Sequence, residues 1–169
     1  MNEQTAHPEA AIKLKEKVGD LKIAMMTTQV FDGHLHARPM HTSQVESTGT
    51  FWFFTSDKSG KVHELQRNNQ VNLAYSDPDG NTYVSVAGHA ELVEDKAKMH
   101  DLWHPMLKAW FADGLDTPDI ALLKVTADSA EYWDTSSNAM VHLYGVAKAM
   151  LTGKSARNDA GENEALDIR

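Results

Sequence analysis

The stretch FWFFTSDKSGKVHELQRNN, residues 51–69, gathers cationic and small polar residues where an aromatic segment gives way to a polar one. Lys58 and Lys61 flank Ser59 and Gly60 at the start of a predicted helix. Such a helix start has unpaired backbone N–H groups and partial positive charge from the dipole. Ser59 can cap the helix or donate its hydroxyl, and Gly60 permits close approach to the backbone. The pattern predicts an anion pocket suited to a phosphate monoester; a capped surface helix with solvated lysines is the alternative.

The same stretch does not fit the phosphate loop of nucleotide-binding proteins. That loop has a glycine five residues before the glycine that precedes its lysine, and a serine or threonine after the lysine. Here these two positions hold Thr55 and Val62. The phosphate-loop interpretation therefore fails at both positions.

Arg38, in the segment HARPM, is a second basic residue placed to reach the same anion. A hairpin would set its predicted strand beside the strand that carries Phe51–Thr55, and a guanidinium suits a bidentate contact with phosphate. Pro39 removes a backbone donor there, which marks a sheet edge, a bulge or a place where something other than a strand lies alongside. A surface ion pair with one of the many carboxylates is the alternative explanation for Arg38.

Histidines and serines offer two further chemistries. His34 and His36 alternate on a predicted strand and His41 follows five residues later, a spacing compatible with a metal site. No carboxylate lies within this run to support a metal, so we expect exposed histidines and no metal. His63 and Glu64, on the short predicted helix, are expected to face solvent or a partner. No serine lies in a strained turn motif such as G-x-S-x-G, so no catalytic triad is predicted.

Composition excludes several classes of protein. The 169 residues contain no cysteine, which excludes disulfides, thiolate metal sites and a cysteine nucleophile. The formal net charge of -8 argues against nonspecific nucleic-acid binding, because phosphate neutralisation needs a basic surface. The N-terminus lacks the apolar core of a signal peptide, and no segment has the length of a membrane span. We expect a cytoplasmic protein that binds neither nucleic acid nor membrane.

The pattern of apolar residues predicts a mainly β chain of the α+β class, closed or sandwiched. Helices are expected at residues 8–19, 60–68 and 95–111, the last kinked or restarted at Pro105. Strands are expected at residues 21–28, 35–44, 48–56, 70–77, 81–95 and 115–134. The unbroken apolar run FWFF indicates a strand that is buried on both faces or covered by a partner.

The chain is expected to form one domain over residues 1–150. Residues 135–153 fit either a terminal helix or an edge strand. Residues 151–169 are mostly polar, and we expect them to form a flexible tail because few side chains there can be buried.

Several of these segments together resemble a known family. The order KIAMMTT, ARPM, FWFFTSDKSGKVHELQRNN, YVSVAGHAELVED and, later, EYWD is similar to the general stress protein 26 branch of the pyridoxamine 5'-phosphate oxidase-like proteins. The resemblance covers about residues 8–150. It implies an FMN-binding split β-barrel with flanking helices, a homodimer, and FMN bound in a groove that both subunits line.

The resemblance also implies roles for individual residues at the flavin phosphate. Arg38 matches the arginine on the early strand, and Ser59 and Lys61 match a Ser/Arg/Lys set that opens the helix. Gly60 stands where the oxidase has a further arginine, so one charged contact is missing and Lys58 is the candidate to replace it.

Four strand residues match positions along the isoalloxazine ring: Pro39, Met40, Phe54 and Thr55. Their backbone groups can bond its polar edge, and the apolar side chains supply the flat slot that a flavin needs. A buried aromatic strand beside a basic turn is also compatible with core and surface alone.

Four aromatic residues lie later in the chain. Trp103 and Trp110 are seven residues apart, so one helical face would carry both, which is typical of core or of a dimer contact. In the related branch this segment lies close to the ring face, so Trp110 or Phe111 would close the pocket. Trp133, in EYWD, fits either role, and we include Trp110 and Trp133 among the candidate flavin contacts.

The predicted function is an FMN-dependent oxidoreductase of unknown substrate, reduced by NADH or NADPH, with no catalytic residue assigned. Pyridoxamine 5'-phosphate oxidase activity itself is not expected, because only Arg157 and Arg169 follow Arg67 and the late basic residues for that substrate are missing. Tyr83 also stands where the oxidase has a glutamine that contacts the flavin across the dimer. The alternatives are a non-catalytic flavin-binding or sensing stress protein, and a split-barrel protein that binds deazaflavin or haem.

Overall fold

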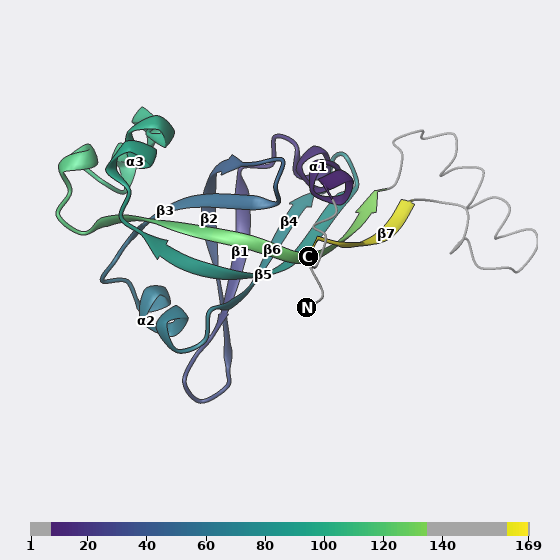
Figure 1. The fold of residues 1–169 in the computed structure, drawn as a ribbon, viewed down its shortest axis with the longest axis horizontal. Coiled ribbons are helices and arrows are strands. Elements are labelled where there is room, and N and C mark those ends of the chain that lie inside the picture. Colours follow the sequence, from purple (N-terminus) through teal and green to yellow (C-terminus); the bar gives the residue numbers. More distant parts are fainter. Residues whose placement is uncertain (1–7, 135–161, 169) are drawn as a thin grey trace, which may run out of the picture.

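In the computed structural model, which describes residues 8–134 and 162–168, the β-strands form one antiparallel sheet in the order β3-β2-β1-β4-β5-β6-β7 (Figure 1). The strands are β1 (Ile23–Gln29), β2 (Leu35–Val45), β3 (Thr50–Ser56), β4 (Gln70–Asp77), β5 (Thr82–Val93), β6 (Ile120–Asp134) and β7 (Glu162–Asp167). A further pairing between β3 and β6 closes β1–β6 into a barrel. The predicted mainly β, closed architecture is confirmed.

Helices cover the ends and one side of this barrel (Figure 1). They are α1 (Pro8–Val18), α2 (Gly60–Arg67), α3 (Lys96–Leu102) and two 3-10 helices, η1 (Pro105–Ala109) and η2 (Gly114–Asp116). Pro105 begins η1, so the predicted restart of the helical segment at this proline is confirmed. None of the helices in the described ranges has the length and apolar character needed to cross a membrane.

Strand β3 is buried on both faces, as its apolar run predicts. Phe51 and Phe53 point into the barrel core, whereas Trp52 and Phe54 belong to a second apolar cluster outside it. Successive side chains of a strand point to opposite faces, so one short strand supplies both clusters. The outer cluster joins β3 to α3, η1 and the segment that follows η1: its other buried members are Met99, Leu107, Phe111 and Leu122.

Strand β2 leaves β3 partway along its length. All of β3 pairs with β6, from Thr50 opposite Thr126 to Ser56 opposite Ile120. The pairing of β2 with β3, in contrast, runs only from Thr42 to Val45 and contains a register shift. Residues 38–41 of β2 therefore pair with β1 alone, and a gap opens between them and the end of β3.

The expectation of a flexible tail is wrong for residues 162–168. Strand β7 pairs with the end of β6, from Ser129 opposite Asp167 to Asp134 opposite Glu162. Leu166 and Ile168 are buried against the barrel core. Low apolar content concealed this strand, because two alternate apolar residues are enough to anchor an edge strand. The predicted helix or strand at 135–153 lies outside the described residues.

We expect Leu166→Ala to lower the free energy of unfolding by about 2–3 kcal/mol, because it removes a buried side chain that fixes β7 to the core. Urea denaturation of the full chain measures the change. Ala165→Ser, at the neighbouring exposed position, is the matched control and should change stability by less than about 0.5 kcal/mol. Equal stability of wild type and Leu166→Ala would show that β7 contributes nothing to the fold.

Candidate functional site

The gap between β2 and β3 holds a cavity of about 400 Å³. Strand β2 forms one wall, and the end of β3 with the start of α2 forms another. Helix η1 and the two residues that follow it cover the opening. The volume is within the range of small-molecule sites. Seven of the predicted flavin contacts line it: Arg38, Pro39, Met40, Phe54, Thr55, Lys61 and Trp110.

Lys61 supplies a positive charge in this cavity. No described residue forms an ion pair or hydrogen bond with its ammonium group. Burial, followed by the nearby charge of Arg38, lowers the pKa of Lys61, although Glu64 opposes this shift. An anion bound in the cavity would raise the pKa of Lys61 again, because a nearby negative charge favours the charged ammonium. Lys61 is thus placed to bind an anion.

Arg38 lines the same cavity and is held in place from behind. Its Nη2 donates to Glu64 Oε2 at 2.9 Å, and its Nη1 donates to the hydroxyl of Thr28. A guanidinium has five N–H donors in a planar fork, so these two contacts leave donors for a ligand. The side chains of Arg38 and Lys61 therefore face a shared cavity rather than opposite surfaces.

The sequence predicts that Glu64 faces solvent or a partner, but its side chain is turned toward residues of its own chain. Its side chain is only 15% exposed, and it accepts hydrogen bonds from Thr28 at 2.5 Å and from Arg38. Its other oxygen contacts His36 Nδ1 at 3.2 Å. Burial alone would raise the pKa of Glu64, but the hydrogen bonds from Thr28, His36 and Arg38 together lower it. Helix α2 packs beside β1 and β5. Its Glu64 also reaches the side chains of His36 and Arg38 on β2.

The remaining walls of the cavity are apolar and aromatic. Phe54 lies at its base, 6.3 Å from Phe111 in a tilted arrangement and 5.7 Å from Trp103 edge to face, measured between ring centroids. Trp103 supports Phe54 from the outer cluster. Trp110, 65% exposed, lies at the mouth of the cavity together with the half-exposed Ile23. A flat apolar group can lie against these rings while its anionic end reaches Lys61.

Three predicted contacts lie outside the lining of this cavity. Lys58 is exposed at the turn before α2. Ser59 is the N-cap residue of α2 but makes no side-chain cap bond; its hydroxyl lies 3.4 Å from that of Thr55. Trp133 is opposite Tyr83, at the far end of β6 from the Ser56–Ile120 pair. The described chain therefore brings Arg38 and Lys61 together but not Trp133.

Sequence reasoning missed four residues that line the cavity: Ile23, His41, Ser56 and Leu107. Ile23 pairs with His41, so both follow from the register of β1 and β2 rather than from any motif. Leu107 reaches the cavity because Pro105 restarts the helical segment as η1. The pairing of β1 with β2 joins separate segments, so no local pattern signals Ile23 or His41. The restart at Pro105 is a local signal, but it does not by itself place Leu107 at the cavity.

His34, His36 and His41 do not come together as a metal site. His34 Nδ1 lies 3.0 Å from Asp32 Oδ2 at the hairpin tip, and His36 contacts Glu64. His41 is an odd number of residues from both, so it lies on the other face of the strand. In the described part of the chain, no group of three or more potential ligands is close enough to hold a metal ion.

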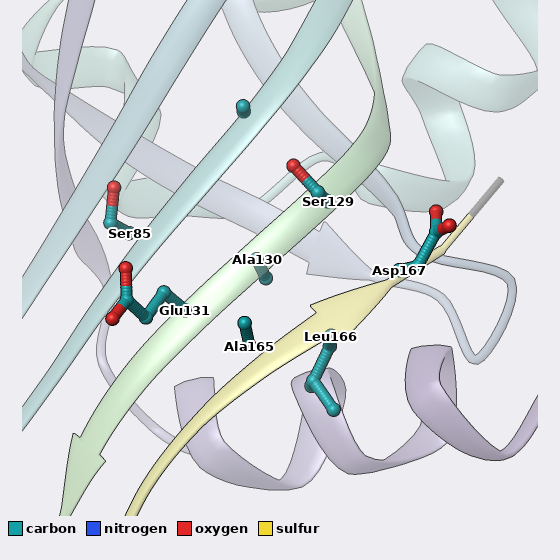
Figure 2. Close-up of a pocket in the computed structure, with 8 residues that line it drawn as sticks. Ser85, Ser129, Ala130, Glu131, Ala165, Leu166 and Asp167 are labelled. Carbon is teal, nitrogen blue, oxygen red and sulfur yellow. The ribbon is translucent and has the colours of Figure 1, made fainter.

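A separate cavity of about 400 Å³ lies over β5, β6 and β7 (Figure 2). Figure 2 shows small side chains along its floor, with Ser85 on β5 and Ser129 on β6, and the carboxylates of Glu131 and Asp167 at its sides. No lysine or arginine is among its described lining residues. Its charge does not suit an anion, so the cavity between β2 and β3 is the better candidate for a phosphate-bearing ligand.

Comparisons with known proteins identify the family of this chain. The family model described as pyridoxamine 5'-phosphate oxidase like matches residues 9–157. General stress protein 26 of Bacillus subtilis is 29% identical over 138 residues, which cover 77% of this chain and 95% of that protein. Protein bli-3 of Neurospora crassa is 29% identical over 168 residues, which cover 89% of this chain and 80% of that protein.

Among solved structures, the general stress FMN/FAD binding protein of Xanthomonas citri superimposes with a TM-score of 0.65 at 32% identity, covering 77% of this chain and 92% of that one. The resemblance found in the sequence and the split β-barrel that it implies are therefore both confirmed.

We expect Glu64→Gln to lower the free energy of unfolding at neutral pH by about 1.5–3 kcal/mol, because it weakens charge-assisted hydrogen bonds to Arg38. The pKa of Glu64 is lowered in the folded protein, so its stabilising contribution is complete above the ordinary carboxyl pKa. That contribution is lost as the pH falls through the lowered value. Denaturation of both proteins across this acidic range should show their difference closing.

The matched control is Glu91→Gln, which weakens the exposed ion pair with Lys124. Its effect should stay below about 1 kcal/mol. A Glu64→Gln effect no larger than that of Glu91→Gln would contradict the view that Glu64 holds Arg38.

Proposed function

Since the chain belongs to the pyridoxamine 5'-phosphate oxidase-like family, we propose that it binds FMN in the cavity between β2 and β3. The observation that carries this proposal is the meeting of Arg38 and Lys61 in one cavity beside an apolar aromatic slot. A flavin mononucleotide needs these two features together: a cationic anchor for its phosphate and a flat apolar site for its rings.

Each side of the cavity has a separate task in this proposal. Lys61 and the free donors of Arg38 hold the phosphate, while Glu64 and Thr28 keep the guanidinium oriented. Phe54 and Met40 pack against the ring system. Bound flavin supplies the capacity to accept and donate hydride, which no side chain of this cysteine-free chain provides.

A second copy of the chain is proposed to complete the site. Trp110 and Ile23 are exposed at the mouth of the cavity, where an apolar surface is stabilised by a partner. The family resemblance implies a homodimer with flavin at the interface. In such an assembly, a residue outside the cavity of its own chain, such as Trp133, can contact the flavin of the other subunit.

The general stress FMN/FAD binding protein of Xanthomonas citri supports a flavin as the ligand. FMN is favoured over riboflavin because its phosphate can pair with Arg38 and Lys61, whereas riboflavin has no anionic group. Arg38→Ala and Lys61→Ala are each expected to weaken the binding of FMN by about 1.5–3 kcal/mol, which is roughly 10- to 150-fold in affinity. The binding of riboflavin should be weakened far less. Quenching of flavin fluorescence measures both affinities, and FAD is titrated beside them.

Lys58→Ala is the matched control, since Lys58 is a lysine of the same turn that does not line the cavity. Its effect on FMN should be less than about three-fold, in keeping with an exposed charge. Equal losses of FMN and riboflavin in the Arg38 and Lys61 variants would indicate damage to the fold rather than to a phosphate contact. Wild-type protein without measurable affinity for FMN would end the proposal.

The reaction that we propose is flavin-dependent oxidoreduction, with NADH or NADPH as the reductant and a small acceptor. Hydride transfer to flavin requires no protein acid or base, so the catalytic task of the chain is to bind and orient. The FMN-loaded protein should lose its flavin absorbance when NADH or NADPH is added without oxygen. Free FMN under the same conditions is the control for direct reduction.

Non-catalytic flavin binding is the competing function. It predicts tight FMN binding and no bleaching by either nicotinamide above the rate of free FMN. Reduction faster than in the control, together with reoxidation by an added acceptor, would favour the enzyme.

A further inference from the structure

A second cavity, of about 600 Å³, adjoins the proposed flavin site. It lies between β2, the end of α3 and the start of η1. His41 and Leu107 line both cavities, so the two spaces meet at these residues. A compound bound in the second cavity would be a direct neighbour of anything bound in the first.

Two polar atoms at this cavity lack hydrogen-bond partners. His41 Nδ1 and Ser43 Oγ are both buried and unpaired within the described chain. They are two residues apart on β2, so their side chains share one face of the strand. A buried polar group without a partner costs stability, and such atoms are rare in folded proteins. Two of them at one cavity indicate that a ligand supplies the missing partner.

The charges around the cavity favour an acceptor of hydrogen bonds. Lys22 lines it and forms no ion pair with the described residues, including Asp101, the one carboxylate in the lining. Burial, then the charges of Lys22 and His104, lower the pKa of His41. The uncharged imidazole can donate from Nδ1, and the Ser43 hydroxyl can donate beside it. His104 accepts from the backbone of Met106 through its own Nδ1, which leaves its other ring nitrogen available.

Four of the remaining lining residues are apolar: Leu102, Trp103, Met106 and Leu107. The other two, Thr42 and Gln44, are polar and already bonded within the chain, Thr42 to Tyr75 and Gln44 to Lys98. The indole of Trp103 also packs edge to face on Phe54 at 5.7 Å, so its position is fixed by the outer cluster. A ligand with a flat hydrocarbon body fits against these side chains.

We propose that this second cavity binds a small aromatic carboxylate. Its carboxylate accepts hydrogen bonds from Ser43 and His41 and pairs with Lys22, and its ring lies against Trp103, Met106 and Leu107. The proposal does not rest on flavin binding. His41 and Leu107 line both cavities, but Lys22, Ser43 and Trp103 line the second one alone.

The test uses the full chain with 2-naphthoate as the probe, 2-naphthamide as its uncharged counterpart, and titration calorimetry as the measurement. Wild type should bind the carboxylate at least ten-fold more tightly than the amide. Ser43→Ala should lower the affinity for 2-naphthoate about ten-fold or more, because a hydrogen bond to a charged group is stronger than one between neutral groups. The same substitution should leave the melting temperature unchanged or raised, because it removes an unpaired buried hydroxyl.

Two controls make the result specific. Ser47→Ala, at an exposed loop position, should change neither affinity nor melting temperature. Lys22→Met should lower the affinity for 2-naphthoate and leave the affinity for 2-naphthamide unchanged. Equal affinity for the two probes, no binding of 2-naphthoate, or unchanged affinity in Ser43→Ala would each overturn the proposal. A parallel FMN titration separates this failure from failure of the flavin proposal.

Discussion

The pairing of β3 with β6 is the constraint on which the site depends. Every residue of β3 has a partner on β6. Strand β3 therefore stays with β6 where the residues of β2 that precede Thr42 separate from it. Pro39 lacks a backbone donor, which suits the stretch of β2 that has no neighbour on this side. The barrel closes through β6 while a gap remains between β2 and β3. Side chains from both strands, α2 and η1 then line the cavity in that gap.

The charged groups around the gap make it suited to an anion. Glu64 binds Arg38 from the side away from the cavity, and Thr28 completes this support. The guanidinium is therefore oriented before any ligand arrives, and less entropy is lost on binding. Lys61 has no such partner among the described residues, and burial lowers its pKa. A fixed cation and an unpaired cation in one cavity form a stronger anion site than two solvated lysines would.

Local patterns predicted much of the fold and the chemical character of the site. Alternation and turn residues located the strands, and the Lys58–Lys61 turn with Arg38 indicated the anion site. The burial of Glu64 was missed because it depends on Thr28 and Arg38, residues of two other segments. Strand β7 was missed because its pairing with β6 joins segments far apart in the chain. What the sequence could not reveal is the set of contacts made by tertiary pairing.

The net charge of -8 does not oppose binding of an anion at this site. Exposed carboxylates are screened over a Debye length of about 8 Å at physiological ionic strength, so the charges that matter are those lining or supporting the cavity. Arg38 and Lys61 contribute two positive charges and Glu64 one negative charge, which leaves a local excess of one. A dianionic phosphate carries one more negative charge than this local excess can neutralise.

Gly60 stands at the position where the oxidase has a further arginine. A Cβ at Gly60 would meet no atom within 4 Å, so this position has room for the side chain of another cation. In the proposed FMN site, the affinity for phosphate would therefore be limited by one missing charge rather than by space.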